Sequence, residues 1–247
     1  MPLLSISIPC YNEEKRLPEK IGPYLDWLEK NLPDYEFVLV DDGSKDGTSR
    51  VMNELAANNK RIKIVSLPEN HGRGFGMKTG VLASSGQFIL ETDADLPVSP
   101  DHIPVFLEYL KTHPDTAFVI GSREHPKSGF VVPQPKLRVF AGKVFHRLFM
   151  WFFGSQFKDV MCGFKLFRHD VAKDIFKYVY DEKFLAAGEI IYVANKFGYK
   201  VVELPVVWED DRRSKVKIVR DTFRTLKGMF ELWLRNLKGM YSRKVKS

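Results

Sequence analysis

Short apolar runs alternate along this chain with longer segments whose apolar residues recur every three or four positions. The short runs predict β-strands over residues 3–8, 37–40, 62–65, 88–90, 117–120 and 200–207. The longer segments predict helices over residues 13–31, 46–58, 74–84, 134–153, 168–178 and 188–197. Because strands and helices take turns, the pattern predicts an α/β, Rossmann-like fold with a mainly parallel central sheet flanked by helices.

The end of the chain has a different pattern. Eight apolar residues follow one another at spacings of three and four: Val216, Val219, Phe223, Leu226, Phe230, Trp233, Leu237 and Met240. This apolar seam predicts one long amphipathic helix. We therefore expect an α/β domain over residues 1–211 and a basic helical tail over residues 212–247.

The tail carries the positive charge of the protein. The whole chain has a net charge of +7. Residues 212–247 hold 12 Lys and Arg against 2 acids, which leaves +10 in the tail and −3 elsewhere. Positive charge concentrated in so short a segment indicates an anionic partner, although it also fits a helix face that is simply exposed to solvent. Nucleic acid is disfavoured, because the aromatic residues lie on the seam rather than among the cations. Packing of the seam on the body and contact with a membrane surface stay open.

No segment is predicted to cross a membrane. The densest apolar run, residues 148–153, is far shorter than the roughly 20 residues that a bilayer core requires. The first strand is too short for a secretory leader. Cys10 and Cys162 lack zinc-binding spacing, and we expect free thiols in a reducing compartment. The expected location is the cytoplasm, peripheral on the cytoplasmic face of a membrane.

Two carboxylates stand directly after the predicted strand 88–90, in the string ETDAD. Asp93 and Asp95 would lie at the carboxyl end of a parallel strand, where α/β sheets bind ligands. Oxygen ligands at such a place suit Mg²⁺ or Mn²⁺, which also contacts substrate phosphates. Taken alone, the pair also fits a surface turn with two solvated acids.

Two other strand ends carry polar residues. Asp41 and Asp42 follow the strand 37–40 and could accept hydrogen bonds from a ribose or a base, although this segment also fits a turn with a helix cap. Tyr11 and Glu13 follow the first strand, where a ring can stack on a base and a carboxylate can accept from its N–H groups. Three strand ends would then meet in one crevice.

Six strings occur in order along the chain: IPCYNEE, VLVDDGSKDGT, NHGRGFGMKTG, ETDADLP, IGSRE and DVMCGFKLF. Over roughly residues 3–220 they resemble the family 2 glycosyltransferases of GT-A fold, and among these the polyprenyl- or dolichyl-phosphate glucosyltransferases and mannosyltransferases. The resemblance implies a metal-dependent, inverting hexosyltransferase. Its donor would be a nucleotide diphosphate sugar, with UDP-glucose favoured, and its acceptor a polyprenyl or dolichyl phosphate.

The resemblance also implies roles for individual residues. Those expected to bind the nucleotide sugar are Pro9, Tyr11, Glu13, Asp41, Asp42, Arg73, Lys78 and Asp93. Those expected to take part in transfer are Asp93, Asp95, Arg123, Arg138, Arg213, Ser214 and Lys215. Within this set Asp95 and Asp93 would hold Mg²⁺ or Mn²⁺, the two arginines Arg123 and Arg138 would lie near the acceptor phosphate, and residues 213–215 would close over both phosphates. Acidic metal ligands and basic groups are what a departing diphosphate requires.

Two positions depart from the family pattern. Relatives carry an acid where Ala187 stands, which leaves acid–base catalysis or acceptor positioning by that residue in doubt. A phosphate acceptor tolerates this loss, because its second pKa is near 6 and it is already anionic at neutral pH. Mannosyl-transferring relatives often carry Gln where Pro97 stands, which favours glucose.

Other functions stay open. They are a soluble family 2 enzyme that acts on a saccharide hydroxyl and needs a general base, a GDP-mannose-dependent lipid-phosphate mannosyltransferase, and a non-catalytic nucleotide-binding homologue. A homodimer also stays open. A dehydrogenase is disfavoured, because the glycines of residues 72–76 are spaced G-x-G-x-G and do not follow the first strand.

Overall fold

The computed structural model describes residues 1–132, 136–154, 157–209 and 218–243, with the backbone alone for residues 132, 136–141 and 218–223. Its strands are β1 (Leu4–Cys10), β2 (Tyr35–Asp42), β3 (Ile62–Leu67), β4 (Phe88–Thr92), β5 (Thr116–Ser122), β6 (Gly129–Val132), β7 (Phe164–Arg168), β8 (Lys200–Pro205) and β9 (Val207–Glu209). Its helices are α1 (Arg16–Asn31), α2 (Thr48–Asn58), α3 (Arg73–Ala83), α4 (His102–Thr112), α5 (Lys136–Phe153), α6 (His169–Ile175), the 3₁₀ turn η1 (Phe176–Tyr178), α7 (Ala186–Lys196) and α8 (Ile218–Leu237).

A seven-stranded sheet forms the centre of the described structure, in the order β3-β2-β1-β4-β7-β5-β8. Neighbouring strands are parallel, except that β7 runs antiparallel between β4 and β5. β6 and β9 form a separate parallel pair. The predicted mainly parallel α/β sheet is confirmed.

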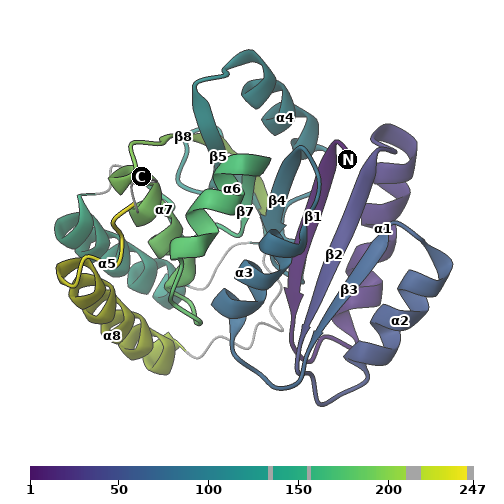
Figure 1. Ribbon diagram of the computed structural model, residues 1–247, viewed down its shortest axis with the longest axis horizontal. Helices are drawn as coiled ribbons and strands as arrows, with labels where there is room; N and C mark the ends of the chain where they lie inside the picture. Colours follow the sequence, from purple (N-terminus) through teal and green to yellow (C-terminus); the bar gives the residue numbers. More distant parts are fainter. Residues whose placement is uncertain (133–135, 155–156, 210–217, 244–247) are drawn as a thin grey trace.

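Helices cover both faces of the sheet (Figure 1). Apolar residues of α1, α2 and α4 form a core on one face, and those of α3, α5, α6, α7 and α8 form a second core on the other face. α3 lies unusually close to β1, because a Cβ on Gly80 would come within 2.2 Å of the Ser7 hydroxyl oxygen. Glycine at this position therefore lets α3 pack directly against the strand.

The hydrophobic pattern does not predict β6, β7 or α4, and it does not separate β9 from β8. In β7, Lys165 interrupts the apolar run and hides the strand. The predicted strand 200–207 is two strands, separated at Val206. The predicted helix 13–31 begins at Arg16, and the backbone N–H of Glu13, just before it, donates to the Thr48 hydroxyl.

The predicted amphipathic helix is confirmed in α8, which ends before Gly239, a residue with a left-handed φ of 70°. The buried apolar side chains by which it packs on the body are Met229 and Leu232, which are 2% and 0% exposed. The seam residues whose side chains are described face solvent instead: Leu226, Phe230, Trp233, Leu237 and, just beyond the helix, Met240. Packing on the body therefore does not explain the seam. The predicted boundary at residue 211 falls outside the described residues.

Two smaller predictions can be compared with the structure. Cys10 and Cys162 are free and buried, as expected for reduced thiols. Within the four described ranges, no helix combines the length and the apolar character that crossing a bilayer requires.

Candidate active site

The carboxyl ends of β2, β1 and β4 lie side by side at one edge of the sheet, since the three strands are adjacent and parallel. The chain passes from β1 to β2 through α1 on one face, and from β3 to β4 through α3 on the other. At such a switch point, open α/β sheets bind ligands. The predicted convergence of the three strand ends is confirmed.

Arg73, the first residue of α3, bridges two acids of the β4 end. Its Nε lies 2.6 Å from Asp93 Oδ1, and its terminal nitrogen lies 3.2 Å from Glu91 Oε1. Glu91 is wholly buried, and burial raises the pKa of its carboxyl although Arg73 and Lys165 act in the opposite direction. The predicted donor-binding Arg73 thus lies in the site as the counter-ion of two carboxylates.

The CGFKLF string encloses this group from β7. Lys165 is wholly buried directly opposite Glu91 in the β4–β7 ladder, and its ammonium donates to the Cys162 carbonyl. A Cβ on Gly163 would lie 2.0 Å from Asp93 Oδ2, so only glycine leaves room for this carboxylate. The string therefore supplies space for Asp93 and a positive charge beside Glu91.

The carboxylate of Asp95 lies within the electrostatic reach of Asp93. Burial and the negative charge of Asp93 raise its pKa to about 6. A divalent cation between the two groups would relieve that repulsion. Mg²⁺ commonly takes one or two carboxylates and completes its shell with water and substrate phosphates. In the described residues no cluster of three or more His, Cys, Asp or Glu could hold a metal alone. The pair thus fits the predicted ion, with other ligands from the substrate.

Asp42 ties the end of β2 to the loop before α3. Its buried carboxylate accepts two backbone N–H groups of residues 71–72 and the side-chain amide of Asn70, at 2.8–2.9 Å. Burial raises the pKa of Asp42 although these donors oppose the shift. Asp41 accepts a backbone N–H of the turn after β2 at 3.0 Å. Both predicted nucleoside-binding acids therefore also shape the loops of the site.

The residues after β1 lie at the same edge. Pro9 is buried within β1, and Tyr11 is partly exposed. Both carboxylate oxygens of Glu13 accept hydrogen bonds from Arg16 at 2.6 Å. The charges of Glu13 and Arg16 both act on the pKa of Asp95, as expected of neighbours.

Arg123 follows β5 and is held rigidly. Its guanidinium donates to both oxygens of Asp159 at 2.7 and 2.8 Å, and its centre lies 4.6 Å from the centre of the Trp208 ring. Burial disfavours the charged form of Asp159, but Arg123 outweighs that effect and the pKa of Asp159 is lowered. The predicted phosphate-binding arginine is thus pre-oriented by a buried acid and a ring.

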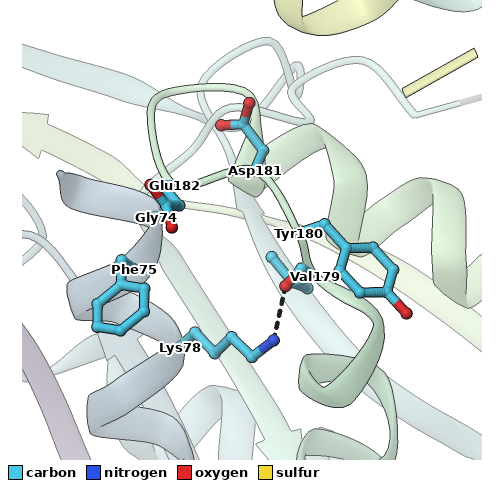
Figure 2. A pocket seen from close by; sticks show the side chains of 7 residues that line it. All are labelled: Gly74, Phe75, Lys78, Val179, Tyr180, Asp181 and Glu182. Atoms are coloured by element: carbon cyan, nitrogen blue, oxygen red, sulfur yellow. Dashed lines mark hydrogen bonds between the residues drawn. The ribbon is translucent and has the colours of Figure 1, made fainter. Parts of the chain in front are cut away.

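Lys78 lies elsewhere. Figure 2 shows it reaching from α3 toward the segment after η1, where its Nζ lies 2.8 Å from the Val179 carbonyl. It lines a small pocket with Phe75, Tyr180 and Glu182, and burial lowers its pKa. Its described contacts do not bring this predicted donor-binding residue together with the strand ends.

Ala187 is buried in α7, and the charge of this region belongs to Glu189. The Glu189 carboxylate accepts the backbone N–H groups of residues 180 and 181 at 2.8 and 2.7 Å, together with the Tyr241 hydroxyl. Arg235 of α8 lies 3.3 Å away. Burial raises the pKa of Glu189. Glu189 therefore joins α7 to the 180–181 loop and to the C-terminal segment.

The remaining predicted residues lie outside the described side chains: Arg138, Arg213, Ser214 and Lys215. Their roles stay predictions.

Sequence reasoning assigned no role to three buried charged residues of the site, Glu91, Lys165 and Asp159. Glu91 and Lys165 each interrupt an apolar run, in FILET and FKLFR. A charge inside a buried strand is rare unless it has a partner. A charged residue inside each apolar run was therefore the feature of the sequence that could have predicted this buried charged pair.

The chain belongs to a known family: the model of "Glycosyl transferase family 2" matches residues 5–176, so this protein is a family 2 glycosyltransferase. "Dolichyl-phosphate beta-glucosyltransferase ALG5A" of Trichomonas vaginalis is 34% identical over 223 residues, which cover 87% of this chain and 68% of the relative. "Dolichyl-phosphate beta-glucosyltransferase" of Homo sapiens is 31% identical over 249 residues, which cover 96% of this chain and 77% of the relative.

Solved structures confirm the predicted GT-A fold. Mannosyl-3-phosphoglycerate synthase from Rubrobacter xylanophilus matches with a TM-score of 0.66 at 19% identity, over 100% of this chain and 77% of that one. Glucosyl-3-phosphoglycerate synthase from Mycobacterium tuberculosis, in complex with Mn²⁺, UDP-glucose and phosphoglyceric acid, matches with a TM-score of 0.61 at 16% identity, over 92% and 79%. At these identities the likeness concerns the fold alone.

Proposed function

We propose that this glycosyltransferase moves glucose from UDP-glucose to a polyprenyl or dolichyl phosphate, with inversion at the anomeric carbon. The observation that carries the proposal is the carboxylate pair Asp93 and Asp95 beside the ends of β1 and β2, which gathers cation ligands and nucleoside-binding candidates at one sheet edge. The names of the two relatives above favour glucose and a lipid phosphate.

In this proposal, Tyr11, Asp41 and Asp42 form the nucleoside end of the site, and Asp93 and Asp95 hold Mg²⁺ or Mn²⁺. When bound, the ion would neutralise charge on the diphosphate. The complex of the mycobacterial synthase of this fold with Mn²⁺ and UDP-glucose supports the choice of ion and donor.

The chemistry is a single displacement. An oxygen of the acceptor phosphate forms a bond to the anomeric carbon, while the bond from that carbon to the β-phosphate oxygen breaks and its electron pair leaves with UDP. Arg123 and the predicted residue Lys215 would stabilise the phosphate charges. An anionic phosphate needs no strong general base, so the reaction accommodates Ala187.

The proposed location is the cytoplasmic face of a membrane. The free, buried thiols of Cys10 and Cys162 support a reducing compartment. The solvent-facing seam of α8 supports contact with the lipid that carries the acceptor.

The test offers UDP-glucose or GDP-mannose, with Mn²⁺, to polyprenyl phosphate and to free saccharides. We expect lipid-linked glucose from UDP-glucose. Asp95→Asn should lower turnover by about a hundredfold or more, the usual effect of removing transition-state charge stabilisation. Asp26→Asn, an exposed site on α1, should have no effect. Transfer to a saccharide alone, a preference for GDP-mannose, or full turnover in Asp95→Asn would contradict the proposal.

A further inference from the structure

The start of α3 lies directly against the loop that follows η1 (Figure 2). The two glycines on either side of Arg73 make this approach possible. A Cβ on Gly72 would come within 2.5 Å of the Glu182 carbonyl oxygen, and a Cβ on Gly74 within 2.4 Å of the Asp181 carbonyl oxygen. Gly72 also has a φ of 115°, which favours glycine. Two glycines of the NHGRGFGMKTG string therefore serve the contact with this loop.

Hydrogen bonds fasten the two segments to each other. We call residues 180–183 the clamp loop. Its Glu182 carbonyl accepts the backbone N–H groups of residues 74–75, at 2.9 and 3.3 Å, and its Lys183 ammonium donates to the His71 carbonyl. Since no side chain caps the start of α3, the clamp loop satisfies two of the N–H groups that a helix N-terminus leaves free.

The backbone around Arg73 is thus fixed on both sides. Asp42 accepts the N–H groups of residues 71–72, just before Arg73, and the clamp loop accepts the N–H groups just after it. From this fixed backbone the Arg73 side chain reaches Asp93, where its Nε lies 2.6 Å from Oδ1. Asp93 is one of the two carboxylates that hold the cation in the proposed function. The clamp loop therefore bears on the geometry of the cation site.

A buried carboxylate of α7 holds the clamp loop in turn. Glu189 is wholly buried, and its Oε2 accepts the backbone N–H groups of residues 180–181 at 2.8 and 2.7 Å. Its other oxygen, Oε1, accepts from the Tyr241 hydroxyl and lies 3.3 Å from an Arg235 nitrogen. The two oxygens have different partners, since Oε2 binds the clamp loop and Oε1 binds the C-terminal segment.

The clamp loop has its own internal restraint, so that Glu189 attaches a preformed turn. Asp181 Oδ1 accepts the backbone N–H groups of Lys183 and Ala186, at 2.8 and 3.1 Å. Loops open locally more readily than core helices and strands do. A loop that fixes the backbone of a site residue therefore needs an anchor in the core, and Glu189 provides it from α7.

We infer that Glu189 is a positioning residue of the donor site, which acts through the clamp loop and the start of α3 on Arg73 and Asp93. The inference deepens the proposed function, on which it rests for the cation at Asp93. It gives α7 a part in the site although position 187 of this helix is alanine.

The experiment measures the affinity for UDP, in the presence of Mn²⁺, by calorimetric titration. Glu189→Leu removes the acceptor of the clamp loop and should weaken UDP binding roughly tenfold or more, the usual effect of removing a group that orients a metal ligand. Glu189→Gln keeps a carbonyl oxygen for the two N–H groups and should restore the affinity of wild type. Tyr241→Phe leaves the partners of Oε2 in place, so it should lower stability without changing UDP affinity.

A surface variant tests the same path without disturbing the core. Lys183 is exposed, and Lys183→Met removes its bond to the His71 carbonyl. This variant should also weaken UDP binding, whereas Lys177→Met, at an exposed lysine of η1, should not. Hydrogen exchange of the amides of residues 74–75 reports on the clamp itself, and it should become faster in Glu189→Leu and in Lys183→Met.

Thermal unfolding shows which variants are folded, and Lys183→Met decides the matter if Glu189→Leu does not fold. Wild-type UDP affinity in folded Glu189→Leu overturns the inference, as does a loss of affinity with unchanged amide exchange at residues 74–75. An equal loss in Tyr241→Phe also overturns it, because lowered stability would then explain both variants. If Mn²⁺ does not improve UDP binding by wild type, the proposed cation site is refuted, while the UDP affinities of the variants still decide the inference.

Discussion

Arg73→Met should destabilise the protein in a pH-dependent way. In the wild type, Arg73 lies 3.2 Å from Glu91 and 2.6 Å from Asp93, and Glu91 is wholly buried. Removing the guanidinium leaves Glu91 with Lys165 as its nearby cation, across the β4–β7 ladder. Breaking a buried ion pair by removing one partner typically costs about 3–5 kcal/mol.

The magnitude has an independent upper limit, because Glu91 can take up a proton instead of remaining an unpaired anion. Protonating a carboxyl of ordinary pKa near 4.3 costs about 1.4 kcal/mol per pH unit, which is about 4 kcal/mol at pH 7 and about 1 kcal/mol at pH 5. In the variant, the pKa of Glu91 in the folded state lies further above its unfolded value. The variant therefore loses stability as the pH rises from the unfolded pKa toward the folded one.

The assay is urea unfolding of wild type and Arg73→Met at about pH 5 and about pH 7. We expect the deficit in the free energy of unfolding to grow by about 2–3 kcal/mol between these conditions. Adding Glu91→Gln should remove most of this growth, since a neutral amide then replaces the wholly buried carboxyl. Arg50→Met removes an exposed arginine from α2 and should change stability by less than about 1 kcal/mol. A deficit of the same size at both pH values would refute the electrostatic account and leave only lost packing.

Two further predictions concern the cation site and the seat of α8. Binding of Mn²⁺ in the presence of UDP should weaken below about pH 6, where Asp95 becomes protonated. Asp93→Asn should move that transition to lower pH, because burial and the Asp93 charge both raise the pKa of Asp95 and the variant removes the second cause. Calorimetric titration measures both effects, and an unmoved transition argues against a contribution from Asp93. Tyr241→Phe should lower the thermal midpoint of unfolding by a few degrees, because the buried carboxylate of Glu189 loses a hydrogen-bond donor worth about 1–3 kcal/mol. Tyr109→Phe on α4 should leave the midpoint unchanged. Equal midpoints of Tyr241→Phe and wild type in differential scanning calorimetry would speak against the role of Tyr241.

The strand-end acids were predictable because their placement depends on local pattern. An apolar run of a few residues indicates a buried strand, and the residues just after it lie at its carboxyl end. Asp42 and Asp93 could therefore be assigned to one edge of a parallel sheet without coordinates. What pattern did not indicate is that Asp42 holds the loop before α3 through three N–H groups.

The partners of the buried charges were not predictable in this way. Asp159 and Arg123 are 36 residues apart, and no local period links them. Lys78 shows a different limit: the family resemblance implied donor binding, whereas its ammonium donates to the Val179 carbonyl. The direction of a helical side chain depends on how the helix packs, and α3 packs closely against β1.

By itself, the sequence determined the order of strands β1–β5 and β8 and of the helices other than α4, the acids at three strand ends and the amphipathic character of the C-terminal helix. Each follows from the spacing of residues that are close along the chain. Only the tertiary structure decided that β7 enters antiparallel beside β4, which brings Lys165 opposite Glu91 and Gly163 against Asp93. It also decided that the seam of α8 faces solvent next to α5. These arrangements depend on which surfaces can be buried together across long separations, and no local period encodes that choice.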